Sequence, residues 1–86
     1  MINQELATIF SRIALFLQIE DVPFKPQAYE KAAMALESLS KDARELYKEK
    51  GQLGLENDIP GVGKGIAAKI EEYIKTGLSA ISITNA

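Results

Sequence analysis

Apolar residues recur every three or four positions over residues 3–18 of this 86-residue chain. That interval places them on one side of a helix, and the residues concerned are Leu6, Ile9, Phe10, Ile13, Phe16 and Leu17. Asn3 has a side chain that suits an N-cap. Pro23 and Pro26 follow the segment, and proline interrupts helices. The pattern therefore predicts a first helix over residues 3–18.

A second helix is expected over residues 26–39, because Ala32, Leu36 and Leu39 share one face of it. Ser40 then suits the N-cap of a third helix that ends at Lys50. Gly51 suits the C′ position, where a positive φ is common.

The segment QLGLEND, residues 52–58, predicts a turn or a single helical turn that supplies Leu53, Leu55 and Ile59 to the core. The last clear helix is expected over residues 64–76, with Gly77 at its C′ position. No alternating pair of strands is visible. The chain is therefore predicted to be all-α, a compact bundle of about four helices.

The composition excludes several kinds of chemistry. The chain has no cysteine and no histidine, so disulfides and thiolate metal sites are impossible, and the usual zinc ligand and neutral-pH general base are missing. No apolar run approaches the roughly 20 residues that a membrane span needs. The N-terminus lacks the basic lead and apolar block of a secretory signal. We therefore expect a cytoplasmic protein without a membrane partner.

The formal net charge of the chain is −2. A protein that coats nucleic acid gains its affinity by neutralising phosphates, so this charge argues against such a coat. It leaves a local phosphate site open, because the distribution of charge matters more than its sum.

The segment NDIPGVGKG, residues 57–65, has the glycines of a phosphate-binding loop but the wrong spacing for a nucleotide. A P-loop requires a glycine where Asp58 stands and a hydroxyl residue where Gly65 stands. A dinucleotide fingerprint requires a glycine at Ile66. No predicted strand leads into the segment. Both nucleotide-binding interpretations therefore fail.

The same segment fits a hairpin between two helices. Pro60 fixes φ at the entry, while Gly61 and Gly63 can adopt positive φ and let two helix ends approach. The first N–H groups of the following helix lack intrahelical partners and favour an anion. Lys64 can reach the same anion. A purely structural role, as a tight turn between packed helices, remains the alternative.

The stretch LENDIPGVGKGIAAKIEEYIKTG closely resembles the helix-hairpin-helix motif, whose hairpin reads apolar, Pro-Gly, apolar, Gly. Upstream, ELATIFSRIALFLQIEDVPFKPQAYEKAAMALESL is similar to the N-terminal, lyase-type domain of bacterial family X DNA polymerases. The resemblance covers roughly residues 3–78. It implies a domain over residues 1–78, with the motif at residues 53–76. Residues 79–86 would be a tail, or the start of a linker to a polymerase domain in cis.

The resemblance implies sequence-nonspecific binding of gapped DNA in base excision repair, by a monomer located near the bacterial nucleoid. The hairpin backbone would follow the phosphates, and the start of the second helix would hold the 5′-phosphate. A ring before that helix would stack on a template base. The implied DNA contacts are Phe24, Lys25, Tyr29, Lys31, Gly61, Gly63, Lys64 and Gly65.

Lys69 matches the lysine that lyase members of the family use as a Schiff-base nucleophile. By helical geometry it borders the buried face beside Tyr73. Gly65 stands where the best-known lyase member has a phosphate-binding lysine, which is a departure from the family pattern.

The resemblance also implies a monovalent cation, K⁺ or Na⁺, on the hairpin carbonyls of Asn57, Ile59 and Val62; the lyase chemistry itself requires no cofactor. The alternative function is a non-catalytic protein–protein module that keeps the hairpin as scaffold. The acidic residues Asp42, Glu45 and Glu49 of the third helix permit it.

Overall fold

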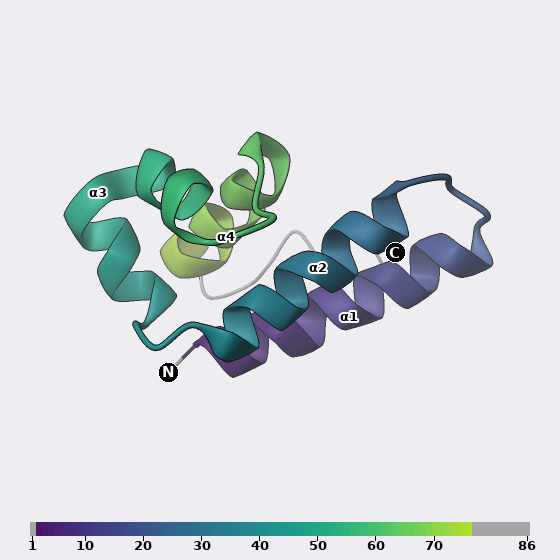
Figure 1. Ribbon diagram of the computed structural model, residues 1–86, viewed down its shortest axis with the longest axis horizontal. Helices are drawn as coiled ribbons and strands as arrows, with labels where there is room; N and C mark the ends of the chain where they lie inside the picture. Colours follow the sequence, from purple (N-terminus) through teal and green to yellow (C-terminus); the bar gives the residue numbers. More distant parts are fainter. Residues whose placement is uncertain (1, 77–86) are drawn as a thin grey trace.

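The computed structural model describes residues 2–76, and four helices account for most of them. In chain order they are α1 (Asn3–Ile19), α2 (Lys25–Ser38), α3 (Ala43–Asp58) and α4 (Lys64–Thr76). α1 and α2 form an antiparallel pair, and α3 and α4 lie against one side of it (Figure 1). Residues 2–76 contain no strand, which confirms the all-α prediction.

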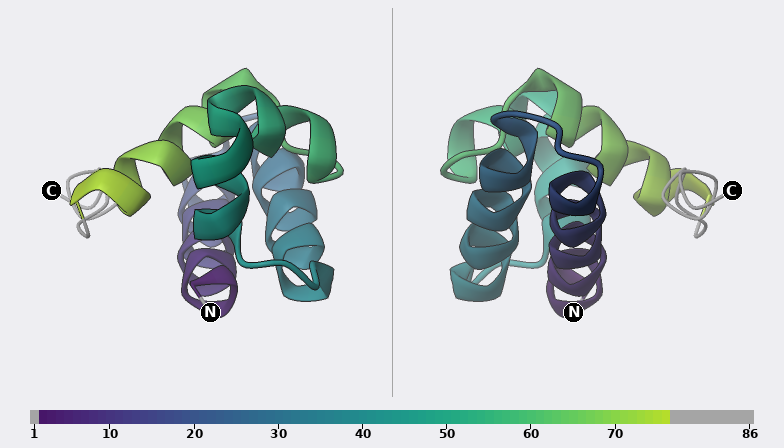
Figure 2. Two further views of the ribbon diagram at one scale, coloured as in Figure 1. Left: turned by 90° about the vertical axis from the view of Figure 1, so that its left-hand side faces the viewer. Right: turned by 90° about the vertical axis from the view of Figure 1, so that its right-hand side faces the viewer.

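Small side chains and one aromatic pair hold α1 and α2 together. Ala7, Ala14 and Ala32 are at most 1% exposed, so the two backbones can approach closely. The rings of Phe10 and Tyr29 meet edge to face, with centroids 5.6 Å apart, an arrangement that aromatic pairs favour. Seen end-on, α1 and α2 stand side by side, with α3 and α4 across them (Figure 2). This packing fixes the position of Tyr29 on α2.

Asn3 does not cap α1, contrary to the sequence prediction. The N-cap residue of α1 is Ile2, and no side chain caps this helix. Asn3 is instead 1% exposed. Its Nδ2 donates to the Lys41 carbonyl at 2.8 Å, and its Oδ1 accepts from the Ala43 N–H at 2.8 Å. The side chain therefore satisfies backbone groups at the start of α3 from a distant part of the chain.

α3 begins later than predicted, and its two halves are the third helix and the helical turn that were predicted on either side of Gly51. Asp42, not Ser40, is its N-cap, and the Asp42 carboxylate accepts from the Arg44 N–H at 2.8 Å. Gly51 has a φ of 69°, the positive value expected of a C′ residue. The chain turns there but resumes a helical path, so residues 52–58 form the second half of a kinked α3. This half, the hairpin and α4 form the predicted helix-hairpin-helix motif.

Two predicted core positions are exposed. Leu53 is 68% exposed, because the kink at Gly51 rotates the second half of α3 relative to the first. Phe16 is 39% exposed, because the end of α1 extends past the region that α3 and α4 cover (Figure 1). Leu55 and Ile59 are at most 1% exposed, which confirms their place in the core.

Two tyrosines fix α4 against the other helices. The Tyr47 hydroxyl on α3 donates to Glu71 Oε2 at 2.6 Å, and the Tyr73 hydroxyl on α4 donates to Glu5 Oε1 at 2.9 Å. These hydrogen bonds raise the pKa of both phenols above the usual value. The contacts hold α4 to α3 and to α1, and so set where its N-terminus lies.

Some sequence predictions fall outside the described residues. The C′ role of Gly77 and the tail at residues 79–86 are among them. Within residues 2–76, no helix is long and apolar enough to cross a membrane.

Candidate functional site

The hairpin between α3 and α4 turns its apolar residues inward and its glycines outward. Ile59 and Val62 are 1% and 5% exposed, and the Val62 N–H donates to the Ile59 carbonyl at 3.1 Å. Gly61 requires its residue type, because its φ is 81°. The turn therefore rests on two buried anchors, and its glycines lie at the surface.

The fold itself does not require glycine at the positions of Gly63 and Gly65. Neither has a positive φ, and a Cβ placed on either would meet no atom within 4 Å. Gly65 lies in the first turn of α4, where glycine offers the helix no advantage over alanine. The fold therefore does not explain the two glycines. A molecule that approaches the backbone closely would explain them, because it would need the space that a Cβ atom would fill.

One pocket gathers six of the residues that the sequence singled out. It lies between the start of α2 and the start of α4, has a volume of about 560 Å³, and is called the hairpin pocket below. Ala28 and Ile66 complete its walls, and the six residues are Lys25, Tyr29, Gly61, Gly63, Gly65 and Lys69. Residues from the two halves of the chain thus meet at one site.

Two helix N-termini meet at this pocket, and neither has an acidic residue in its first turn. In α1 and α3 that turn contains Glu5 and Glu45, respectively. Both α2 and α4 begin instead with a lysine, Lys25 and Lys64, although a cation is unfavourable at the positive end of a helix dipole. The arrangement therefore suits an anion supplied from outside the chain.

Backbone donors are available at the start of α4. The first intrahelical bond runs from the Ala67 N–H to the Gly63 carbonyl at 2.9 Å. Among residues 2–76, no acceptor pairs with the N–H groups of Gly63, Lys64, Gly65 and Ile66. Unpaired N–H groups at a helix start bind phosphate or carboxylate groups.

The lysines near the hairpin differ in their partners from the lysines on α3 and just before it. Lys41, Lys48 and Lys50 each form an ion pair with a carboxylate. In the described part of the chain, no carboxylate pairs with the four lysines near the hairpin, which are Lys25, Lys31, Lys64 and Lys69. The positive charge near the hairpin is therefore not neutralised locally, despite the acidic net charge.

Tyr29 presents its hydroxyl rather than its ring to solvent. The residue is 8% exposed, and burial raises the pKa of its phenol, which keeps the hydroxyl protonated. No described residue hydrogen-bonds to this hydroxyl. Every fully buried side-chain oxygen or nitrogen in residues 2–76 has a hydrogen-bond partner, so an unpartnered hydroxyl is not fully buried. The hydroxyl therefore reaches solvent and can donate to a bound anion.

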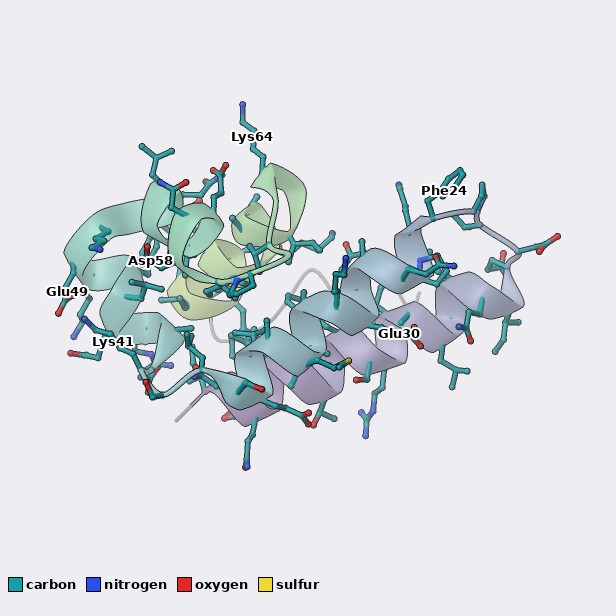
Figure 3. All side chains as sticks on the ribbon, in the orientation of Figure 1. Phe24, Glu30, Lys41, Glu49, Asp58 and Lys64 are labelled. Atoms are coloured by element: carbon teal, nitrogen blue, oxygen red, sulfur yellow. The ribbon has the colours of Figure 1, made fainter. Side chains whose placement is uncertain are left out.

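Phe24 and Lys64 do not line the hairpin pocket. Phe24 is 85% exposed at the α1–α2 turn, and its φ of 67° is strained for a bulky residue. Lys64 points away from the body of the protein (Figure 3). Both are accessible to a long ligand that extends past the pocket.

Lys31 lies on α2 outside the hairpin pocket, and its alkyl chain runs beside Gly61. Asn57 is exposed at the end of α3. The Ile59 carbonyl already accepts one hydrogen bond, so one lone pair remains for a cation. Among residues 2–76, no cluster of acidic side chains could hold a metal ion.

Sequence reasoning missed the walls at Ala28 and Ile66 and the lack of acidic residues at both helix starts. The second feature was visible in the sequence, since no Asp or Glu occurs at residues 25–28 or 63–66.

Comparison with known proteins identifies relatives. A model of the helix-hairpin-helix domain matches residues 1–79. The chain is 35% identical over 81 residues to the DNA polymerase/3′-5′ exonuclease PolX of Bacillus subtilis (strain 168). That match covers 93% of this chain but only 13% of the relative.

Proposed function

Because the chain belongs to the helix-hairpin-helix domain family, in a form related to PolX, we propose that it binds DNA without sequence preference. The bound element is the sugar–phosphate backbone on the 5′-phosphate side of a gap. The hairpin follows the backbone, and the hairpin pocket takes the terminal phosphate.

The observation that carries this proposal is the clearance at Gly63 and Gly65. Neither glycine is needed by the fold, since neither has a positive φ and each leaves open space. The nearest N–H groups lack partners in the described residues. A DNA backbone that approaches closely would use both features at once.

The hairpin pocket supports the choice of a terminal phosphate. It combines two lysine side chains, a phenol hydroxyl and two helix starts at one place. A terminal phosphate carries more negative charge than a phosphate within the strand, so it gains more from this arrangement.

Salt dependence and a 5′-phosphate preference test the proposal. If Lys25, Lys31 and Lys64 each neutralise one phosphate, a fourfold rise in salt should weaken binding by about 20- to 40-fold. Lys25→Ala should lower the preference for 5′-phosphate over 5′-hydroxyl about tenfold, as expected for a charge-assisted hydrogen bond. Arg12→Ala, an exposed cation on α1, is the control. Salt-independent binding, or an equal effect of both variants, would contradict the proposal.

Gly65→Ala should change stability and DNA binding in opposite directions. The methyl group meets no atom within 4 Å and φ is not positive, so the lower entropy of the unfolded chain should stabilise the fold by roughly 0.4–1 kcal/mol. The same methyl group intrudes where the backbone approaches, so affinity for gapped DNA should fall at least threefold, the equivalent of about 0.7 kcal/mol. Urea denaturation and fluorescence anisotropy measure the two effects. A variant that is both more stable and equally tight would remove the clearance argument.

The proposal includes deoxyribose-phosphate lyase chemistry at Lys69. This residue is half-buried and lines the same pocket as Lys25 and Tyr29. Its neutral amine would add to the C1′ aldehyde of the opened sugar and expel water to form a Schiff base, while the neighbouring groups hold the phosphate. Loss of a C2′ proton to water would then break the C3′–O3′ bond, so that the downstream strand leaves with its 5′-phosphate, and hydrolysis of the imine would free the amine. We also propose that this domain works together with a polymerase domain in cis.

A monovalent cation on the carbonyls of Asn57, Ile59 and Val62 completes the proposal. It would offset repulsion between those oxygens and a nearby phosphate. DNA affinity in K⁺ or Na⁺ should then exceed affinity in tetramethylammonium at equal ionic strength. Equal affinities in all three salts would argue against the ion.

The alternative, a protein–protein module, has less support. Glu45 and Glu49 form ion pairs with Lys48 and Lys41, and Asp42 caps α3. The acidic face that favours this alternative is thus largely neutralised by its own neighbours.

A further inference from the structure

A second pocket lies on the other side of the hairpin tip, and we propose that it receives one unstacked base of the DNA strand held by the hairpin pocket. The inference rests on the proposed function, because the base must belong to a strand whose phosphate is bound nearby. The second pocket would then bind a base, whereas the hairpin pocket binds a phosphate.

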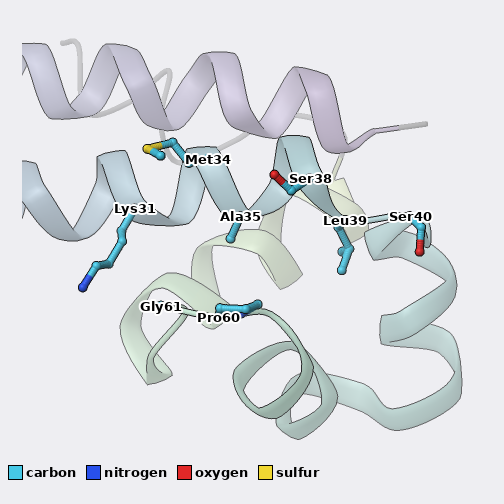
Figure 4. A pocket seen from close by; sticks show the side chains of 8 residues that line it. All are labelled: Lys31, Met34, Ala35, Ser38, Leu39, Ser40, Pro60 and Gly61. Carbon is cyan, nitrogen blue, oxygen red and sulfur yellow. The ribbon is translucent and has the colours of Figure 1, made fainter.

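The second pocket lies between α2 and the residues Pro60 and Gly61 (Figure 4). Its volume is about 680 Å³, within the range of small-molecule sites. Ala35 and Leu39 point from α2 and its end toward the hairpin in Figure 4. Met34 lines the same pocket and is 66% exposed. Ala35, Leu39 and Pro60 supply apolar surface between α2 and the hairpin, and the Met34 thioether adds apolar surface at the edge of the pocket, on which a flat base can rest.

Polar groups without partners lie around the apolar surface of the second pocket. The hydroxyls of Ser38 and Ser40 make no hydrogen bond with any residue in the described range 2–76. The edge of a base presents both donors and acceptors, which hydroxyls can pair with because they act as either. This combination suits a base better than it suits a purely apolar side chain.

The two pockets are neighbours, with Gly61 and Lys31 at the boundary between them. Gly61 lines both pockets. The Lys31 alkyl chain lies 3.5 Å from the position of a Cβ on Gly61. Lys31 is the charged residue that lines the second pocket, and in residues 2–76 it has no carboxylate partner. A strand that leaves the hairpin pocket therefore passes this cation before it reaches the apolar surface.

The spacing along α2 matches a short length of DNA. Ala28 lines the hairpin pocket and Ala35 lines the second pocket. Seven residues of helix span about 10 Å, which is the rise of about three nucleotides in a stacked strand and of fewer in an extended one. One strand can therefore occupy both pockets.

Two strands with equal numbers of phosphates test the inference. One is 5′-phosphorylated oligothymidine, and the other is the same sugar–phosphate chain without bases; amide NMR spectra follow both titrations. Both should shift the Gly63 and Gly65 amides. Only the strand with bases should shift the amides of Ser38, Leu39 and Ser40, and it should bind about five- to 150-fold tighter.

Met34→Ser separates the second pocket from other base contacts. It should lower the preference for the strand with bases at least threefold. Leu53→Ser, an equally exposed apolar residue on α3, should not. Phe24→Ala removes a ring at the α1–α2 turn, outside the second pocket, and should leave the base-dependent shifts of Ser38 and Ser40 intact.

The other possible outcomes of the two titrations would contradict the base pocket, the proposed function or both. Equal shifts of Ser38 and Ser40 by both strands, or no shift by either, would overturn the base pocket while Gly63 and Gly65 still support DNA binding. Shifts of these serines on concentrating the protein without DNA would indicate a protein interface instead. No shift of Gly63 and Gly65 by either strand would overturn the proposed function as well.

Discussion

Asn3→Ala should lower the free energy of unfolding by about 2–4 kcal/mol. The Asn3 amide bonds to the Lys41 carbonyl and to the Ala43 N–H, and the residue is 1% exposed. Removing it leaves the buried Ala43 N–H without an acceptor and the partly buried Lys41 carbonyl without a donor, and an unsatisfied buried group costs about 1–3 kcal/mol. Small domains have little stability to lose, so much of the population should unfold near physiological temperature.

Urea denaturation followed by circular dichroism measures this loss. Gln4→Ala, an exposed neighbour on α1, is the matched control and should change stability by less than about 0.5 kcal/mol. A loss below about 1 kcal/mol for Asn3→Ala would mean that water replaces the amide and that the contact does not anchor α3.

Lys69→Ala should abolish the covalent trapping of a pre-incised abasic site by borohydride. The reagent reduces the imine between the lysine nitrogen and the sugar C1′ to a stable amine, so the adduct reports the nucleophile directly. Alanine is the best helix former, and Lys69 forms no ion pair with any residue in the described range. The variant should therefore fold and still bind DNA.

The controls for this experiment lie on the same helix and in the same pocket. Lys75→Ala removes a lysine near the end of α4 that pairs with Glu71, and should trap as well as the wild type. Lys25 lines the hairpin pocket with Lys69, so it is the nearest competing amine. Trapping that persists in Lys69→Ala but disappears in Lys25→Ala would assign the nucleophile to Lys25.

The hairpin was predictable from the sequence because its information is local. Pro60 and the glycines around it restrict or free the backbone at single positions, and the helix periods on both sides mark where the turn must lie. The family resemblance predicts DNA contacts at Lys25 and Tyr29 and a nucleophile at Lys69. Their common pocket exists because the fold places the start of α4 beside the start of α2, which no local pattern specifies.

The sequence predictions were wrong at Asn3 and Leu53, where contacts between residues far apart in the chain or a break in the helix determine the structure. The pattern around Asn3 suits an N-cap, but its partners lie 38 and 40 residues away, beyond any local rule. Leu53 continues an apolar pattern, but the kink at Gly51 resets which face of the helix is buried. The face of a helix can be predicted from periodicity only while the helix is continuous.

The most direct test of the central claim is a titration of the protein with 5′-phosphorylated gapped DNA, monitored residue by residue in NMR spectra. Binding through the hairpin predicts saturable, salt-sensitive shifts of the Gly61, Gly63, Gly65 and Lys69 amides. Gly63→Val should suppress these shifts in a protein that remains folded. Shifts confined to α3, or undiminished binding by Gly63→Val, would contradict the claim that the hairpin backbone binds the DNA phosphates.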